Sequence, residues 1–288
     1  MTVTRRYDAL LLDLDGTIVD HDGEIRPRTI EAVRLARDAG VHVMVATGRS
    51  EPATHPVLEV LGLEEHDAVV FNGAARYSPR SRRLTHQFTL TERIRDDVLG
   101  HAHEKSYLPV SMFEGKKFAP EPRNEIERAA LADMHRLETA EWERIREPSP
   151  GERPIRLTLY SDQHPTSQAF ADEIAAQIAD PVFLTHFPLG ILPHHHGSPL
   201  IVLDVHPPCR GKSEALDYLA THVGIPSERV VAIGDAGNDI EMLRDAGLGV
   251  CMAEAAPDVQ AVADRMIGAC SSDTVAELID ELFLTPAH

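Results

Sequence analysis

The segment Ala9-Leu10-Leu11-Leu12 is an unbroken apolar run that stops abruptly at Asp13. A strand with one wet face alternates polar and apolar residues, whereas a strand buried on both faces is apolar throughout. Strands of the second kind belong to parallel sheets that are covered by helices on both sides. This run therefore predicts a central strand of an α/β fold.

Helices and strands alternate after this run. A helix is predicted over residues 28–39, with Pro27 in its first turn and Gly40 just past its end. Strands are predicted over residues 41–46 and 68–71. Short strand–helix–strand links indicate right-handed crossovers and a parallel sheet.

The pattern changes in the middle of the chain and then resumes. Candidate strands there are shorter and more alternating, and charged stretches such as residues 123–147 are expected to be helical. The α/β alternation returns in elements predicted over residues 212–223, 230–233, 239–246, 248–252 and 273–283. We therefore expect a Rossmann-like core over residues 1–78 and 194–288, and an inserted α+β cap domain over residues 79–193.

The charge of the chain limits its partners. A formal net charge of −18 argues against nucleic acid, because binding there depends on Lys and Arg that neutralise phosphates. It also disfavours anionic membrane surfaces. An anionic substrate must therefore be held by local positive charge or by a metal ion.

The cellular compartment is expected to be the cytoplasm. The apolar run before Asp13 is too short for a signal peptide or a membrane span. Cys209, Cys251 and Cys270 share no tight spacing, which favours a reducing compartment over a disulfide framework or a zinc site.

The segment Asp13-Leu14-Asp15-Gly16-Thr17 puts two carboxylates at the end of the first predicted strand. Ligands of open α/β sheets bind at this edge, and carboxylates two residues apart in extended chain point the same way. One can attack phosphorus while the other, when protonated, donates to the leaving oxygen. A turn that uses Asp and Gly for its backbone geometry explains these residues about equally well.

A second acidic segment, Gly234-Asp235-Ala236-Gly237-Asn238-Asp239, follows another predicted strand. Asp235 and Asp239 offer the oxygen ligands that Mg²⁺ takes. Without a cation, several carboxylates in one pocket would raise each other's pKa. Helix capping is the alternative, and it explains Asp239 but leaves Asp235 unexplained.

Two further segments offer groups that bind anions. Thr47-Gly48-Arg49 ends the second strand, where the Thr47 hydroxyl and the following backbone N–H groups can grip phosphate oxygens. Lys212 stands at a predicted helix start, where the dipole favours anions and a lysine alone is unfavourable. An exposed lysine without a role is the plainer alternative.

Together these segments resemble the four motifs of the haloacid dehalogenase superfamily, in the same order: Asp-x-Asp-Gly-Thr, Thr-Gly-Arg, Lys-x-x-Ala-Leu and Gly-Asp-x-x-Asn-Asp. The predicted cap, preceded by Phe71-Asn72-Gly73-Ala74, is similar to that of the Cof-type, type IIB (C2-capped) branch. The resemblance covers the whole chain, but in the cap it is carried by position and not by residues.

The resemblance implies a phosphatase of small phosphorylated metabolites in which Asp13 forms an aspartyl-phosphate and Asp15 acts as acid and then as base. Asp13, the backbone carbonyl of Asp15, and Asp235 would hold Mg²⁺, with Asp239 in or just behind that set. The residues expected to bind the phosphoryl group are Thr47, Gly48, Lys212 and Asn238. Arg49, Asn72 and Gly73 are candidate substrate-binding residues, because they are expected near the predicted hinges of the cap or on the core face beneath it.

Other functions remain open at this point. Phosphomannomutases of the same branch carry related motifs, so a phosphosugar mutase is the alternative enzyme. A protein of a different class, which binds phosphorylated metabolites without catalysis, is the other alternative. Such a protein has no need of Asp15, so the presence of Asp15 counts against this alternative.

Three segments depart from the family pattern or stand outside it. Glu254-Ala255 stands where the family often has Asn-Ala, and Asp273-Thr274-Val275-Ala276 where it often has Asp-Gly-Val-Ala. The run His194-His195-His196 suggests a metal, but adjacent histidines in a loop are more often simply exposed.

Overall fold

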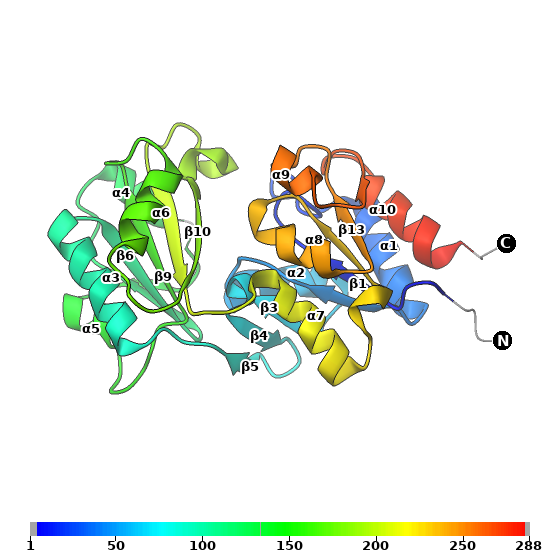
Figure 1. Cartoon of the computed structure of the whole chain (residues 1–288), viewed down its shortest axis with the longest axis horizontal. Helices are drawn as coiled ribbons and strands as arrows, with labels where there is room; N and C mark the ends of the chain where they lie inside the picture. Colours follow the sequence, from blue (N-terminus) through cyan, green and yellow to red (C-terminus); the bar gives the residue numbers. More distant parts are fainter. Residues whose placement is uncertain (1–4, 133, 286–288) are drawn as a thin grey trace. The chain divides into compact units, whose positions relative to one another are not determined.

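The computed structural model describes residues 5–132 and 134–285, and the chain divides into two compact units (Figure 1). One unit, called the core below, combines Met1–Thr85 with Arg210–His288. The other, called the insert, is His86–Cys209. The expected α/β architecture, with a parallel core sheet and a separate sheet in an inserted segment, is confirmed.

The core is built on a five-stranded parallel sheet with strand order β14-β13-β12-β1-β2. Its strands are β1 (Ala9–Leu12), β2 (His42–Val45), β12 (Val230–Gly234), β13 (Leu248–Cys251) and β14 (Arg265–Met266). All four residues of β1 are buried, as its apolar run predicts. Because β1 pairs with both β2 and β12, the residue after it, Asp13, lies at the carboxyl edge between two neighbouring strands.

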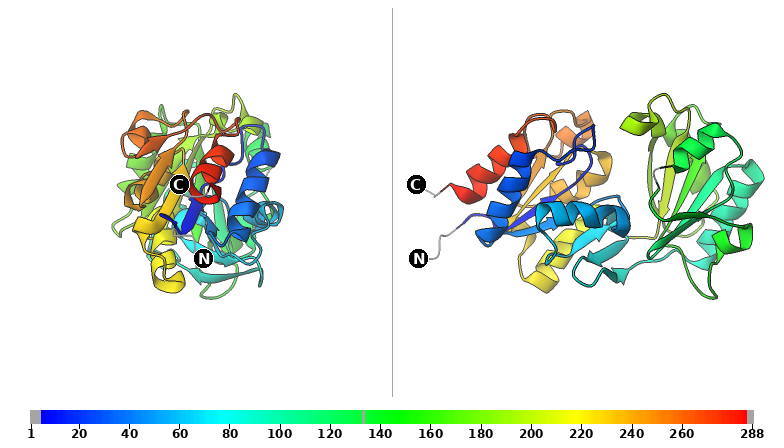
Figure 2. Two further views of the ribbon diagram at one scale, coloured as in Figure 1. Left: turned by 90° about the vertical axis from the view of Figure 1, so that its right-hand side faces the viewer. Right: turned by 180° about the vertical axis from the view of Figure 1, so that it is seen from behind.

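Helices cover both faces of this sheet. They are α1 (Pro27–Asp38), α2 (Glu51–Leu61), α7 (Glu214–Tyr218), α8 (Ile240–Asp245), α9 (Pro257–Gln260) and α10 (Thr274–Ile279). Helices α1 and α10 lie side by side (Figure 2), and an ion pair joins Arg28 of α1 to Asp280, the residue after α10. Helices α7, α8 and α9 contribute Leu216, Met242 and Val259 to an apolar cluster with the β-sheet.

Short helical turns extend or join these elements. They are η1 (Phe71–Gly73), η4 (Gly211–Ser213), η5 (Leu219–Val223), η6 (Ser227–Arg229), η7 (Gly237–Asp239) and η8 (Asp280–Leu284). A small sheet of β3 (Ala68–Val70), β4 (Ala75–Ser78) and β5 (Arg83–Gln87) follows α2, and its strands β3 and β4 are antiparallel. Strand β3 runs beside the end of β2, since the Thr47 N–H donates to the Val69 carbonyl at 2.9 Å.

The insert has a six-stranded mixed sheet with strand order β10-β11-β9-β6-β7-β8. Its strands are β6 (Leu108–Phe113), β7 (Lys116–Ala119), β8 (Leu137–Thr139), β9 (Arg156–Ser161), β10 (Phe183–Pro188) and β11 (Ile201–His206). Its helices are α3 (Glu92–Lys105), α4 (Glu125–Leu131), α5 (Trp142–Arg146) and α6 (Ser167–Ala175), with short turns at Leu189–Ile191 and Pro193–His195. Apolar side chains of α3 and α6 pack on one face of the sheet against Leu159 and Leu203.

The chain passes between the two units at later residues than the sequence indicates. The insert spans His86–Cys209, whereas the cap is predicted over residues 79–193. Strand β11 pairs with β9 and β10, so Ile201–His206 belongs to the insert sheet and not to a core that resumes at residue 194. An apolar strand such as this suits either sheet, and its partners are set by pairing across the chain. Residues 123–147, expected to be helical, hold two short helices and strand β8.

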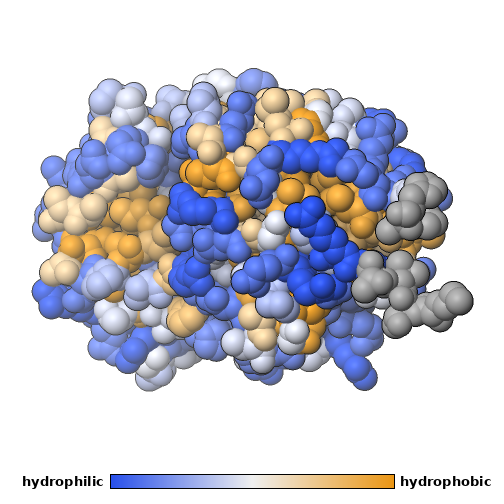
Figure 3. Space-filling view, turned by 45° about the vertical axis from the view of Figure 1, so that its right-hand side comes forward, coloured by the Kyte–Doolittle hydropathy of each residue, from blue (hydrophilic) through white to orange (hydrophobic). Residues whose placement is uncertain are grey.

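The face of the molecule drawn in the space-filling view carries many polar side chains (Figure 3). Hydrophilic side chains spread over much of the face seen in Figure 3, with hydrophobic areas between them. The exposed large hydrophobic residues among those described are spread over several elements: Leu35, Val60, Ile126, Ile191, Leu192 and Met266. Within residues 5–132 and 134–285, no helix has the length and apolar character needed to cross a membrane.

Gly73 offers a test of how the loops at the carboxyl edge pack. It has φ +93°, and a Cβ there would lie 2.0 Å from the backbone oxygen of Gly211. Gly73→Ala should therefore lower the free energy of unfolding by the cost of a left-handed residue, roughly 1–2 kcal/mol, plus about 1–3 kcal/mol for the forced backbone shift. Urea unfolding measures the loss.

Gly40→Ala is the matched control, because Gly40 has φ +82° with open space around it. It should show the conformational cost alone, about 1–2 kcal/mol. Equal losses in both variants would contradict the close approach of the Gly73 and Gly211 loops.

Candidate active site

The loop after β1 brings Asp13 and Asp15 to the carboxyl edge of the core sheet. The Asp13 N–H donates to the Ile233 carbonyl at 3.0 Å, so the loop continues beside β12. Gly16 has φ +83°, and a Cβ at this position would lie 2.4 Å from Oδ2 of Asp235. Glycine therefore allows the loops after β1 and β12 to touch, which brings the two acidic motifs together.

A buried lysine joins these motifs. Nζ of Lys212 donates to Oδ1 of Asp13 at 2.5 Å and to Oδ1 of Asp239 at 2.6 Å. The side chains of Lys212, Asp13 and Asp239 are 2%, 4% and 0% exposed. The alternative of an exposed lysine without a role does not describe Lys212.

Asp239 caps a helix start, as the capping alternative predicts, and it also binds Lys212. Its Oδ2 accepts hydrogen bonds from the backbone N–H groups of Asp235 at 3.0 Å and Ala236 at 2.9 Å, which satisfies donors at a helix start. Its Oδ1 binds Lys212. Asp235 instead accepts a hydrogen bond from the Thr17 hydroxyl at 3.1 Å.

Burial controls the protonation of this group. Burial raises the pKa of Asp13 well above its ordinary value, against the opposing charge of Lys212. Burial and the Asp239 charge likewise raise the pKa of Asp235 to about 6. Burial would lower the pKa of Lys212, but the charges of Asp13 and Asp239 outweigh it and raise that pKa. The pocket therefore holds more carboxylates than one ammonium can neutralise.

These residues fit a magnesium ion. Ligand oxygens of Asp13, Asp235 and Asp239 all lie within 4.8 Å of one another. Mg²⁺ prefers carboxylate oxygens and usually keeps several waters. A divalent cation would also neutralise the surplus negative charge of the pocket.

Asp15 is more exposed than the buried acids. Its side chain is 57% exposed, and the Arg49 guanidinium binds both carboxylate oxygens, with Nε at 2.9 Å from Oδ2. The Arg49 backbone N–H donates to the Thr47 hydroxyl oxygen at 3.1 Å. Arg49, proposed from the sequence to bind substrate, is thus paired with the expected acid. The sequence contains both residues within their motifs, but nothing in it indicates that Asp15 and Arg49 pair with each other.

The asparagines meet at the same edge. Nδ2 of Asn238 donates to Oδ1 of Asn72 at 2.9 Å. Asn72 has φ +52°, and a Cβ on Gly48 would lie 3.0 Å from its Oδ1. The Asn72 amide therefore lies against the turn that follows Thr47. Thr17 is the partner of Asp235 to which the sequence assigned no role, although it stands in the first motif.

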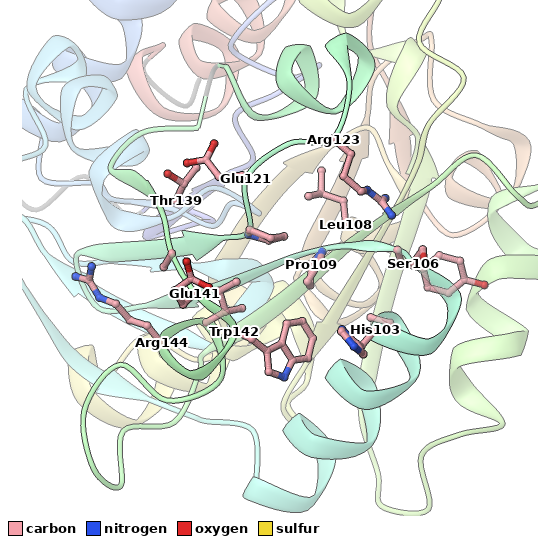
Figure 4. A pocket seen from close by; sticks show the side chains of 15 residues that line it. His103, Ser106, Leu108, Pro109, Glu121, Arg123, Thr139, Glu141, Trp142 and Arg144 are labelled. Atoms are coloured by element: carbon pink, nitrogen blue, oxygen red, sulfur yellow. The ribbon is translucent and has the colours of Figure 1, made fainter.

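A separate hollow of about 780 Å³ lies within the insert (Figure 4). Trp142 and His103 line it, with ring centroids 4.9 Å apart, together with Arg123 and Arg144. All of its lining residues belong to the insert, and none is among the site residues expected from the sequence.

Replacing Lys212 tests the charge balance of the pocket. Lys212→Met leaves buried carboxylates without their cation, so metal-free protein should lose about 3–5 kcal/mol of unfolding free energy. Removing the ammonium raises the pKa of Asp13 further. A raised acid pKa makes the folded state bind more protons, so the loss should grow between about pH 5 and pH 8. Urea unfolding with a chelator at both pH values checks this.

Lys116→Met is the control, because Lys116 forms a partly exposed ion pair with Glu152 at 2.8 Å. Its loss should be at most about 1 kcal/mol. A Lys212 variant as mild as this control, or one whose loss shrinks as the pH rises, would contradict the proposed charge balance.

Comparison with known proteins shows which family the chain belongs to. The model of the family described as haloacid dehalogenase-like hydrolase matches residues 10–279. The pyridoxal phosphate phosphatase YbhA of Escherichia coli (strain K12) is 26% identical, over 94% of this chain and 96% of its own. The HMP-PP phosphatase of Serratia proteamaculans (strain 568) is 27% identical, over 86% of this chain and 85% of its own.

Solved structures show the same fold. The subclass IIB sugar phosphatase BT4131 has a TM-score of 0.77 at 22% sequence identity, over 95% of this chain and 98% of its own. The resemblance of the sequence to the haloacid dehalogenase superfamily is thus confirmed. The chain belongs to the haloacid dehalogenase-like hydrolase family.

Proposed function

We propose that this chain is a magnesium-dependent phosphatase of small phosphorylated metabolites in which Asp13 takes up the phosphoryl group. The observation that carries the proposal is the buried Asp13 carboxylate at the end of β1, bonded to Lys212 and beside Asp235. The matched relatives named as phosphatases of pyridoxal phosphate and of HMP-PP support a small phosphorylated substrate.

The reaction has two steps. An oxygen of Asp13 bonds to phosphorus while the bond to the leaving oxygen breaks, and Asp15 gives its proton to that oxygen. A water then attacks the aspartyl-phosphate and loses a proton to Asp15, which releases phosphate and restores Asp13. Asp15 also makes dehalogenation the poorer fit, because that chemistry has no leaving alkoxide to protonate.

The surrounding groups hold the phosphoryl oxygens. Lys212, the Thr47 hydroxyl, the Gly48 backbone and Asn238 offer positive charge and hydrogen-bond donors at one edge of the sheet. Phosphoryl transfer depends mainly on such positioning and charge neutralisation. Asp13, Asp235 and the backbone carbonyl of Asp15 would hold Mg²⁺, which would supply positive charge to offset the charge developing on the phosphoryl oxygens.

Asp239 supports the residues that would hold Mg²⁺ and the phosphoryl group. Its two oxygens are engaged by Lys212 and by two backbone N–H groups. Asp239 therefore positions Lys212 and the loop that presents Asp235. Arg49 holds Asp15 in this structure, and an anionic substrate that binds Arg49 would free Asp15 for proton transfer.

The insert is the proposed specificity element, in the role of a cap. Its sheet carries polar side chains on the face opposite α3 and α6, where Arg156 pairs with Asp204 at 3.4 Å and Thr158 bonds to the same carboxylate. Such groups can distinguish leaving groups by their hydrogen bonds.

A substrate panel tests the proposal most directly. Purified protein is assayed with Mg²⁺ against sugar phosphates, nucleotides, flavin precursors and pyridoxal phosphate. Release of phosphate that needs Mg²⁺ and favours some of these metabolites is expected. The proposal would be contradicted if the protein hydrolysed neither any metabolite of the panel nor a generic aryl phosphate.

Asp13→Asn should remove activity while keeping the shape of the site. The amide is not a nucleophile, so hydrolysis of an aryl phosphate should fall to background. Retention within about tenfold of the parent rate, a barrier change of only ~1.4 kcal/mol, would rule out the covalent route. Thermal unfolding of the variant confirms that it is folded.

Asp15→Asn should separate acid catalysis from metal binding. Its proposed metal contact is through the backbone, so the Mg²⁺ concentration for half-maximal activity should change little. Turnover should fall more for alkyl phosphates than for aryl phosphates, whose leaving groups need less protonation. Asp22→Asn, at an exposed position of the same loop, is the control and should leave both rates unchanged. Equal losses on both substrates would give Asp15 a structural role only.

A further inference from the structure

A second group of metal-ligating side chains lies in the core, apart from the three acids described above. It comprises His21, Glu254 and Cys270, whose ligand atoms all lie within 4.8 Å of one another. We propose that these residues bind a zinc ion, or another divalent transition metal that accepts sulfur and nitrogen ligands. The proposal does not depend on the phosphatase activity.

The chemistry of the ligands selects the class of metal. A thiolate, an imidazole and a carboxylate together suit zinc, whereas Mg²⁺ takes oxygen ligands. Sγ of Cys270 lies 3.8 Å from Nε2 of His21. At a tetrahedral zinc with bonds of ~2.3 Å to sulfur and ~2.0–2.1 Å to nitrogen, these atoms lie about 3.6 Å apart. The observed separation therefore needs little adjustment to hold an ion.

The backbone around His21 is fixed by its own hydrogen bonds. Val19 and Ile25 form an antiparallel bridge, which makes a hairpin of the loop between them. Within it, Oδ1 of Asp20 accepts from the backbone N–H groups of Asp22 and Glu24, both at 3.0 Å. His21 thus stands in an ordered turn.

The other two loops are tied to each other and to this hairpin. The Ala253 N–H donates to the Gly268 carbonyl at 3.2 Å, which joins the loop of Glu254 to the loop of Cys270. Arg26, at the end of the hairpin, donates to Asp273 at 2.6 Å and to the Ser271 carbonyl at 2.8 Å. The three ligands are therefore held together without a metal, which reduces the ordering that binding requires.

The site is open to solvent and negatively charged. His21 and Glu254 are exposed while Cys270 is buried, so an ion can enter from the side of His21 and Glu254. The pKa of the Cys270 thiol is raised by burial and then by Glu254, Asp235 and Asp20, whose charges also favour a cation. Three protein ligands leave a fourth position of a tetrahedral zinc for water.

Cobalt provides the decisive probe, because it occupies zinc sites and gives a thiolate-to-metal absorption band in the near ultraviolet. Full-length protein, freed of metal with a chelator, is titrated with Co²⁺ in the presence of excess Mg²⁺. The band should saturate at one equivalent in the parent protein. It should persist in Asp235→Asn, since the oxygen site contributes no sulfur.

Variants assign the band to this site. Cys270→Ser should remove it, whereas Cys209→Ser, the matched control at a cysteine outside the group, should keep it. His21→Ala and Glu254→Gln, at exposed positions, should each weaken Co²⁺ binding by on the order of tenfold or more, because loss of even an outer partner costs ~10–100-fold.

Thermal unfolding with Zn²⁺ gives an independent readout. An ion that binds only the folded state raises the unfolding temperature. Zn²⁺ should therefore stabilise the parent and Cys209→Ser more than His21→Ala and Glu254→Gln, which keep the buried thiol. Three outcomes would each overturn the proposal and leave an ordinary Cys–His contact. The parent gives no cobalt band, the band survives in Cys270→Ser, or zinc stabilises all four proteins equally.

Discussion

The arrangement of the site depends on one buried ammonium between two buried carboxylates. Lys212 bonds to Asp13 after β1 and to Asp239 after β12, so it joins segments that lie far apart in the chain. Moving ions out of water costs several kcal/mol each, and the attraction offsets this only when the geometry is good. The close loops around Gly16 and Gly73 supply that geometry, because a side chain at either would force them apart.

Much of this site could be predicted from the sequence because its residues sit at the ends of regular elements. Asp13, Thr47 and Asp235 each follow a strand of the parallel sheet, and Lys212 starts a helical segment. The carboxyl ends of parallel strands meet at one edge, so local patterns place these residues together without any long-range information. The structure brings them to that edge, while their catalytic and binding roles stay proposals.

Two features were not predicted from the sequence. One depends on strand pairing between distant segments, and the other on prolines that the helix tolerates. Ile201–His206 is a buried apolar strand whose sequence suits either sheet, and only its pairing with β9 and β10 places it in the insert. No element is predicted over residues 51–61, yet helix α2 forms there and contains Pro52 and Pro56. Pro52 lies in the first turn, where a missing N–H costs nothing, and Gly62 ends the helix in the left-handed conformation.

The cysteines show the same limit of sequence patterns at the proposed second metal site. Their spacing argued against zinc, because spacing rules detect only ligands that are close in sequence. His21, Glu254 and Cys270 come from three distant loops, and Glu254 is one of the departures from the family pattern. Asp235 belongs to the oxygen site, yet its charge also acts on Cys270. Cations at the two sites would share this carboxylate's field and repel each other, so each should weaken the binding of the other, by reciprocal amounts.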